Sequence, residues 1–262
     1  MRKVVNVVLV IAALLVASTM AMGTEIDPFN SRPVPIVDAT EPEVDLQILL
    51  NQIYGCPGCV NADTDQQAAG MWGIVSPGVI APLLQFEYAG YNEGNEFGLW
   101  YGTDTERPLV TRTIFQGDAH APPQPGSSTW AAIQWYTPTS GEIFGDPLLV
   151  YTGLFSGIPY TSFGFFLDGP GTGDGKFWTV DQLNPGGPLN GTAQAVAYRH
   201  GLSDTWVLAF EDVLIGGGAD KDYNDFVVSV ESLVPVPEPA TLTLLGTGLI
   251  GLAGLVRRKL KK

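Results

Sequence analysis

Basic side chains are scarce in this sequence. Lysine and arginine together number 13 against 27 acidic residues, which gives a formal net charge of −14 at pH 7. Seven of the 13 lie at the two chain ends, so the body of the chain keeps six: Arg32, Arg107, Arg112, Lys176, Arg199 and Lys221. So acidic a surface repels a phosphate backbone, which argues against nucleic acid as a partner and leaves cations as the natural counter-species.

Cysteine and histidine are almost absent as well. The segment CPGC holds both cysteines, Cys56 and Cys59, and the histidines are His120 and His200. With no other cysteine and no histidine near them in sequence, a zinc site would lack ligands, and no G-x-S-x-G motif is present for a Ser–His–Asp hydrolase. We expect Cys56 and Cys59 to form a disulfide, which over so short a loop contributes about 2 kcal/mol. Redox activity and free thiols are the alternatives.

Long apolar runs occur only near the chain ends. At the N-terminus the basic MRK precedes the apolar VVNVVLVIAALLVA and the small-residue segment STMAMG. This order is typical of a secretory signal peptide, so we predict that residues 1–23 are cleaved after Ala21 or Gly23. The mature chain would then fold outside the cytoplasm. An uncleaved membrane helix is the alternative, although the run is short for a span.

A second uncharged run, residues 240–256, is followed by the basic end RRKLKK. As a helix it would be about 25 Å long, slightly short of the hydrocarbon core of a membrane. Basic residues just after a span hold that end in the cytoplasm, which places the body of the chain outside. Pro237 and Pro239 break any helix before the run and leave Glu238 in an extended segment.

These features of residues 235–262 resemble the PEP-CTERM sorting signal: Pro237, Glu238 and Pro239, then a Gly-rich span, then a basic end. The resemblance implies export by an exopolysaccharide-producing bacterium. It also implies attachment to the inner membrane through the C-terminal helix and processing by an exosortase. A plain permanent anchor is the alternative.

Glycine and proline are abundant, at 32 and 20 residues, while the apolar fraction of 45% is ordinary. This combination favours short strands joined by turns over disorder. Residues 24–45 are Pro-rich and polar, and we interpret them as a linker or extended arm. The spacing of Leu46, Leu49, Leu50 and Ile53 then predicts one short amphipathic helix that ends at Gly55 and caps the open end of a sandwich.

From Val79 onward, short apolar segments recur with Gly, Pro, Asn or Asp between them. The segments are VIAPLLQFEYA, EFGLWYG, LVTRTIFQG, TWAAIQWY, LLVYTGLF, SFGFFLDG, KFWTVDQL, TAQAVAYRH, TWVLAFEDV and NDFVVSVES. The pattern predicts an all-β domain over residues 46–234, an antiparallel β-sandwich or jelly roll with one short N-terminal helix. The signal peptide and a C-terminal transmembrane sorting helix would flank it.

The segment TWVLAFEDVLIGGGADKDYNDFVVSV predicts a hairpin, and its apolar pattern also predicts the register of the two strands. Pairing Phe210 with Phe226 also sets Leu208 opposite Val228 and Trp206 opposite Val230, and these side chains form one apolar face.

The same register places acidic side chains where their negative charge is unfavourable. Extended past Phe210, it sets Asp212 opposite Asn224 on the core face and Glu211 opposite Asp225 on the other face. Facing carboxylates destabilise a strand pair, and a buried uncompensated one costs several kcal/mol. Lys221 is the only base nearby in sequence.

A bound Ca²⁺ would resolve this conflict, because it takes six to eight oxygen ligands from carboxylates, amides and carbonyls. The candidate ligands are Glu211, Asp212, Asp220, Asp222, Asn224 and Asp225. The segment is not an EF-hand, since Asp225 stands where that loop needs glycine. A solvated acidic turn, whose side chains bond their own backbone, is the alternative.

The stretch FEDVLIGGGADKDYNDFVV is also similar to the C-terminal signature of the domain of unknown function 4114. YAGYNEGNEFGLW and FGFFLDG are similar to its earlier strands, so the likeness runs from about Leu46 to Val234. The resemblance implies a β-rich fold and a metal-supported hairpin, and it does not imply a catalytic activity. Its signature positions carry over to Phe210, Glu211, Asp212, Gly217, Gly218, Asp220, Asp222, Asn224 and Asp225.

We therefore expect a non-catalytic, Ca²⁺-stabilised module of the cell surface or extracellular matrix that faces extracellular polysaccharide. Exposed aromatic rings would stack on sugars, although half of any alternating set must fill the core. The candidates are Trp100, Tyr101, Trp130, Trp135 and Tyr136. The alternative is a secreted carbohydrate-active enzyme that uses paired carboxylates.

Overall fold

The computed structural model describes residues 32–41, 43–67, 70–76, 78–87, 94–102, 110–115, 129–169, 175–185 and 192–236. The predicted signal peptide, residues 1–23, and the sorting tail from Pro237 onward lie outside these residues. Among the residues described, no helix has the length and apolar character that a membrane crossing needs.

The described chain is built mainly of strands, with a single α-helix, α2 (Leu46–Tyr54), and a 3₁₀ turn, η3 (Asp181–Leu183). The strands are β1 (Trp72–Gly73), β2 (Val79–Glu87), β3 (Glu96–Tyr101), β4 (Val110–Phe115), β5 (Thr129–Thr137), β6 (Ser140–Gly145), β7 (Gly153–Ser156), β8 (Gly164–Asp168), β9 (Lys176–Trp178), β10 (Ala195–Arg199), β11 (Trp206–Phe210), β12 (Phe226–Glu231) and β13 (Val234–Pro235).

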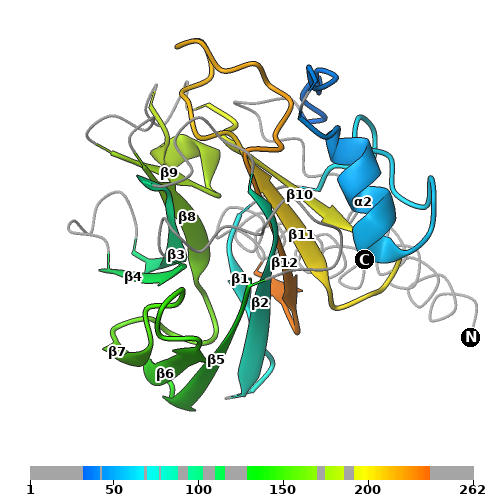
Figure 1. The fold of residues 1–262 in the computed structure, drawn as a ribbon. Helices are drawn as coiled ribbons and strands as arrows, with labels where there is room; N and C mark the ends of the chain where they lie inside the picture. The colour runs from blue at the N-terminus through cyan, green and yellow to red at the C-terminus, as the bar shows by residue number, and fades with distance from the viewer. Residues whose placement is uncertain are drawn as a thin grey trace, which may run out of the picture.

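These strands form antiparallel sheets (Figure 1). The larger has seven strands in the order β10-β11-β12-β2-β5-β6-β7, and the smaller has four in the order β4-β3-β8-β9. A two-stranded ribbon joins β1 to β13. The prediction of antiparallel β-structure with one short helix is confirmed, and the finer prediction of a sandwich or jelly roll stays a prediction.

Strand β6 was missed by the sequence pattern, because SGEIFG has two glycines and only two large apolar residues. A close backbone approach requires the first of these glycines. A Cβ on Gly141 would lie 2.1 Å from the carbonyl oxygen of Gln134 on the neighbouring β5, where no side chain fits. Backbone crowding, which the sequence does not show, therefore sets the composition of this strand.

Both larger sheets contribute to one apolar core. Phe97 from β3 stacks on Phe165 from β8 and on Phe226 from β12, with ring centroids 5.3 Å apart in each pair. Trp100 and Trp135 are buried, so neither is a candidate for stacking on sugars, whereas Trp130 and Tyr136 on β5 are exposed. Alternation along β5 thus sends one set of side chains into the core and leaves the other outside.

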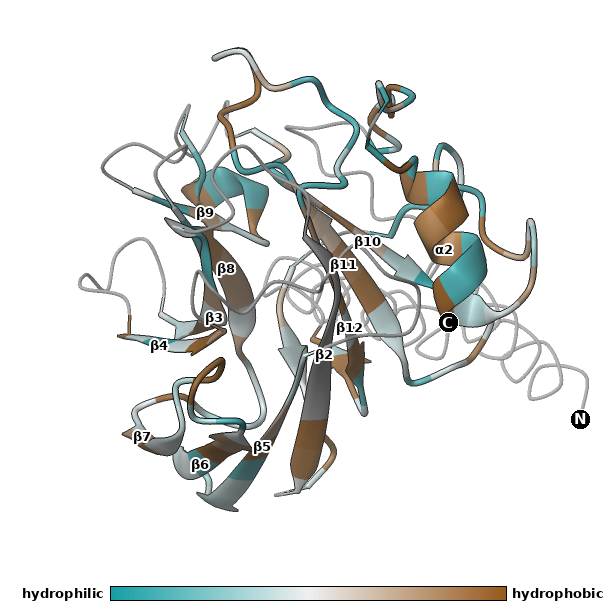
Figure 2. Cartoon of the chain, viewed as in Figure 1, coloured by the Kyte–Doolittle hydropathy of each residue, from teal (hydrophilic) through white to brown (hydrophobic). Residues whose placement is uncertain are grey.

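A second apolar cluster lies between α2 and the opposite face of β10, β11 and β12. Leu46, Leu49 and Leu50 of the helix pack with side chains of these strands, including Val207 and Val227. Figure 2 shows the helix beside this sheet, with hydrophobic positions along its ribbon. The helix ends at Gly55, whose φ of 66° is the left-handed conformation of a C-terminal cap. The predicted helix is confirmed, but its expected position was wrong: it covers a sheet face, because β11 is apolar on both faces.

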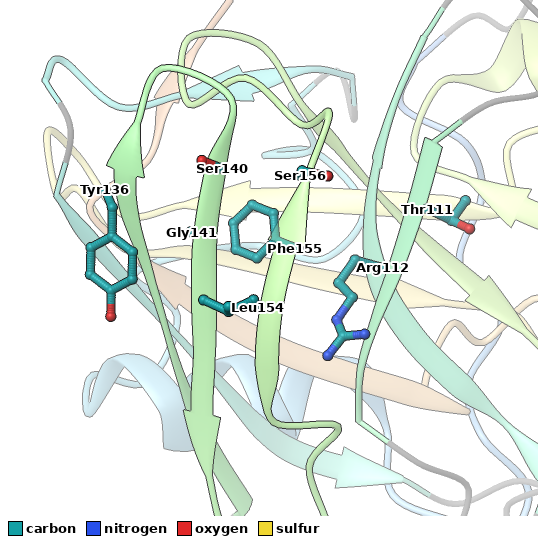
Figure 3. Close-up of a pocket in the computed structure, with 8 residues that line it drawn as sticks. All are labelled: Thr111, Arg112, Tyr136, Ser140, Gly141, Leu154, Phe155 and Ser156. Carbon is teal, nitrogen blue, oxygen red and sulfur yellow. The ribbon is translucent and has the colours of Figure 1, made fainter.

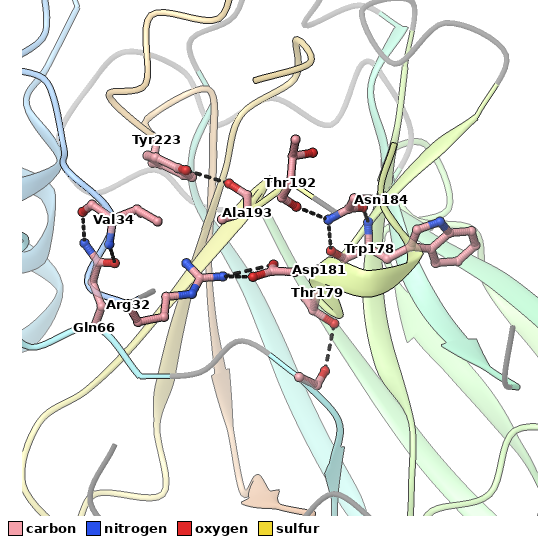
Figure 4. A network of polar contacts seen from close by, with 11 residues as sticks. Arg32, Val34, Gln66, Trp178, Thr179, Asp181, Asn184, Thr192, Ala193 and Tyr223 are labelled. Atoms are coloured by element: carbon pink, nitrogen blue, oxygen red, sulfur yellow. Dashed lines mark hydrogen bonds and ion pairs between the residues drawn. The ribbon is translucent and has the colours of Figure 1, made fainter. Parts of the chain in front are cut away.

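Residues 32–41 and 43–45 lie against the domain. The Arg32 guanidinium donates to both carboxylate oxygens of Asp181, at 3.0 and 2.9 Å, in a buried ion pair (Figure 4). The Val34 N–H donates to the side chain of Gln66, which donates back to the Val34 carbonyl. The N-terminal segment of the described chain is therefore fixed at side chains far away in sequence.

The contact between β3 and β8 generates a test of core packing. A Cβ on Gly164 would lie 2.3 Å from Nε1 of Trp100, which donates to the carbonyl oxygen of Phe165. We expect Gly164→Ala to lower the free energy of unfolding by about 1–3 kcal/mol through overpacking, measured by urea unfolding. Gly175→Ala is the control, because nothing lies within 4 Å of that position. Equal stability of the two variants would contradict the packing described.

Candidate metal centre

The candidate site lies in residues 211–225, the loop that joins β11 to β12. These strands pair with Phe210 opposite Phe226, Leu208 opposite Val228 and Trp206 opposite Val230, which confirms the predicted register. The ladder ends at Phe210 and Phe226. The extension that set Glu211 directly opposite Asp225, and Asp212 opposite Asn224, was therefore wrong: the Glu211 carboxylate accepts from N–H groups of the loop, and that of Asp212 accepts from Asn95.

Glu211 is fully buried and is held by the backbone of the loop. Its carboxylate accepts hydrogen bonds from the N–H groups of Tyr223, at 2.7 Å, and of Lys221, at 3.3 Å. Both donors have left-handed backbone, with φ of 55° and 70°. This conformation is uncommon for residues with a side chain and is retained where the surroundings over-determine it. The loop is therefore shaped around the Glu211 carboxylate.

Asp222 and Asn224 form a second part of the cluster, and both are buried. Asp222 accepts hydrogen bonds from the backbone N–H and the Nδ2 of Asn224, at 3.2 and 2.8 Å. Nδ2 of Asn224 also donates to the carbonyl oxygen of Val44, just before α2. Its Oδ1 is buried and has no hydrogen-bond partner in the described part of the chain.

Asp212 and Asp225 form the third part, next to β3. The backbone N–H of Asp212 donates to Oδ2 of Asp225 at 2.9 Å, and Nδ2 of Asn95 donates to Oδ2 of Asp212 at 3.1 Å. Oδ1 of Asn95 is buried and, among the described residues, has no hydrogen-bond partner. Sequence reasoning missed Asn95, which precedes β3 and reaches the loop across a separation of 117 residues.

Two groups of carboxylates converge, and Asp220 belongs to both. Oxygens of Glu211, Asp220 and Asp225 lie within 4.8 Å of one another, and so do oxygens of Glu43, Asp220 and Asp222. Four of the six predicted ligands belong to these groups, and the other two, Asp212 and Asn224, adjoin them through hydrogen bonds with Asp225 and Asp222. Glu43, which comes from the segment before α2, was not predicted, because its charge looks like any other surface charge in the sequence.

The cluster has no basic partner among the described residues. The Lys221 side chain is exposed. The ion pairs found among the described residues join Arg32 to Asp181 and Lys176 to Asp168, and neither includes a carboxylate of the cluster. Desolvation by burial raises the pKa of Glu211 to about 8, with the nearby charge of Asp220 adding to the shift. Burial likewise raises the pKa of Asp222 to about 7 and that of Asp225 to about 9. Near neutral pH Glu211 and Asp225 therefore hold protons, and Asp222 is about half protonated, unless a cation replaces the protons.

The donor set fits a hard cation. Carboxylate and amide oxygens are the ligands that Ca²⁺ takes, and oxygens that share one ion at 2.3–2.6 Å lie no more than about 5 Å apart. Glu211, Asp220 and Asp225 meet this spacing. The unpartnered amide oxygens of Asn95 and Asn224 would supply neutral ligands at the edges of the cluster.

The other predicted residues lie apart from this cluster. Cys56 and Cys59 are joined by a disulfide after α2, with Cα atoms 5.7 Å apart. The inference that no histidine comes near them was wrong: His200 is distant in sequence, but its ring nitrogen lies within 4.8 Å of the sulfurs, because β10 ends beside the helix. Pro237, Glu238 and Pro239 lie outside the described residues.

The raised pKa values generate a prediction for the metal-free protein. A carboxylate has a pKa near 4 when unfolded, so between pH 4 and about 9 the folded chain binds more protons than the unfolded chain. Its free energy of unfolding should therefore fall as the pH rises through this range, by up to about 1.4 kcal/mol per pH unit for each group. Urea unfolding in EDTA at pH 5 and pH 8 measures the change.

Glu211→Gln is the matched variant, since its neutral amide replaces the protonated carboxyl. It should unfold like the wild type at pH 5 and be the more stable protein at pH 8. A wild type equally stable at both pH values would show that these carboxyls titrate as exposed groups do.

Comparisons with known proteins identify two parts of the chain. Residues 235–259 match the PEP-CTERM protein-sorting motif, and residues 159–233 match the domain of unknown function DUF4114. The second match covers β8 to β12 and the whole acidic loop, and is shorter than the likeness expected from Leu46. No match was found among curated proteins or solved structures. The chain thus carries the sorting motif of exported proteins that exosortase processes, placed directly after a DUF4114 segment that holds the acidic cluster.

Proposed function

We propose that this exported protein is a non-catalytic module of the cell surface or extracellular matrix, and that Ca²⁺ bound at the acidic cluster stiffens its β-domain. One observation carries the proposal: buried carboxylates of the loop 211–225 converge with Asp220 and with Glu43 from the segment before α2, and they have no basic partner among the described residues. Burying charge without compensation is costly, and a cation removes that cost while it ties the contributing segments together.

The ligands would join segments that are distant in sequence. Glu211 follows β11, Asp225 precedes β12, and Asp220 lies between them at the exposed side of the loop. Asp220 is also close to Glu43, so a cation near it would connect the loop to the segment before α2. Bound Ca²⁺ would therefore make one rigid unit of the loop, the end of the large sheet and the N-terminal segment.

Placement outside the cell suits this role. The sorting motif indicates export and transient attachment to the membrane before processing, which supports the proposed place in the outer layers of the cell. A rigid domain in a chain of net charge −14 would bind cations. In that layer, polysaccharide is the partner we propose.

The alternative of a glycoside hydrolase receives less support from the same residues. Hydrolysis needs two carboxyl groups that flank a sugar linkage, with room for the substrate between them. Glu211, Asp212 and Asp222 are at most 2% exposed, so a sugar chain has no access to them. Release of reducing ends from acidic and neutral polysaccharides, assayed beside binding, would reveal such an activity.

The metal proposal predicts stabilisation by Ca²⁺. For the full chain in a mild detergent, Ca²⁺ at a hundred times its Kd should raise the free energy of unfolding by about 2.7 kcal/mol over EDTA. Asp220→Asn should abolish most of this gain, because Asp220 belongs to both carboxylate groups. Thermal unfolding with and without Ca²⁺, and titration calorimetry, measure the two quantities.

Asp204→Asn is the matched control. Asp204 is also an exposed aspartate, but it belongs to neither carboxylate group, so its replacement should leave the Ca²⁺ effect intact. Absence of both heat and thermal shift in the wild type would rule out the metal, and an equal loss in both variants would mean that Ca²⁺ only screens surface charge.

A further inference from the structure

A cavity of about 500 Å³ opens where edge strands of the two larger sheets approach each other. It extends from β5 across β6 and β7 to β4, and in Figure 1 these strands lie at the opposite end of the molecule from the acidic loop. The side chains that the argument uses are Thr111, Arg112, Tyr136, Ser140, Leu154 and Ser156 (Figure 3). A volume of this size is typical of a ligand site.

Arg112 on β4 supplies a cation to this cavity. Its Nη2 donates to the carbonyl oxygens of Tyr151 and Thr152, at 3.3 and 3.1 Å, which fixes the plane of the guanidinium. Neither ion pair among the described residues involves Arg112, and its buried Nε–H has no hydrogen-bond partner there. A guanidinium held only by neutral carbonyls keeps its charge available for a carboxylate, which it binds better than an ammonium does.

Hydroxyl groups line the same cavity. Ser140 on β6 and Ser156 on β7 are directly opposite each other in the sheet, and Thr111, whose side chain points away from Arg112 in Figure 3, precedes Arg112 on β4. Hydroxyls both donate and accept hydrogen bonds, so they suit a ligand that itself has many hydroxyl groups.

An exposed apolar surface continues the cavity along the sheet. Tyr136 is 52% exposed and Leu154 is 73% exposed, and the Tyr136 hydroxyl donates to Glu142 at 2.8 Å, which holds the ring in place. Trp130, 57% exposed, lies on the same face of β5 six residues away, about 20 Å along the strand. Ring faces spread over this length suit a chain of units rather than a single small molecule.

We propose that this groove binds an acidic polysaccharide. A sugar carboxylate would lie on the Arg112 guanidinium, its hydroxyls at Ser140 and Ser156, and the apolar face of a ring against Tyr136. The assignment deepens the proposed function and rests on it, because the chain meets such a polymer only as a module of the extracellular layer. The charge complementarity is local: one cation in a strongly acidic protein selects an anionic unit of an otherwise neutral, hydroxylated chain.

Binding of hyaluronan to the full chain tests the groove, with dextran as the uncharged sugar polymer and polyglutamate as the carboxylate polymer without sugar. Titration calorimetry in CaCl₂ should show binding of hyaluronan alone. Arg112→Gln should weaken it at least tenfold, Arg112→Lys should restore part of it, and Tyr136→Ala should weaken it severalfold. Arg199→Gln is the matched control, because Arg199 is likewise held by carbonyl oxygens but lies on β10, outside the groove.

Each result bears on one proposal. Equal affinity for dextran or polyglutamate, or full affinity in both Arg112→Gln and Tyr136→Ala, overturns the groove. If Arg112→Gln also lowers the thermal midpoint, its loss of binding could come from unfolding. The affinity of Tyr136→Ala for hyaluronan then tests the groove, because that ring is exposed and its loss leaves the core intact. A chain that gains stability from Ca²⁺ but does not bind hyaluronan lacks the groove activity and keeps the metal centre.

Discussion

Burial of carboxylates at the end of one strand pair is the constraint around which this structure is arranged. Glu211 follows directly from a fully buried strand, so its side chain enters the protein whatever its charge. In the loop, two residues with left-handed backbone point their N–H groups toward the Glu211 carboxylate. Asn95, which precedes a strand of the smaller sheet, donates to Asp212. The loop thus keeps an unusual conformation because it solvates an acid that water no longer reaches.

The two apolar clusters explain why that acid is buried. Strand β11 sends Leu208 and Phe210 into the core between the sheets and Val207 and Ala209 toward α2, so neither face is open to solvent. A strand covered on both sides leaves its end covered as well. The helix is therefore part of the site: it closes the second face and positions Val44, whose carbonyl oxygen holds Asn224.

The sequence predicted the features of the fold that depend on the alternation of side chains along a strand. The register of β11 and β12 follows from the period of two in WVLAF and FVVSV. The same register predicted that Glu211 and Asp225, which follow and precede these strands, would lie close together, as they do. The sequence did not predict contacts that depend on the path of the chain. Asn95, Glu43 and His200 reach their positions across long separations, and no local pattern distinguishes them from surface residues. Strand β6 was missed because backbone proximity, which leaves no apolar period, selected its glycine.

The junction between the domain and the sorting motif has a consequence for processing. Strand β13 pairs with β1 through Val234 and Pro235, the N–H of Val236 donates to the Met71 carbonyl, and Pro237 is the next residue. No spacer separates the folded body from the sorting motif, because the matched motif begins at Pro235, inside this ribbon. The last strand pair of the domain and the start of the sorting motif therefore share residues, so an enzyme that recognises the motif meets the folded domain at once.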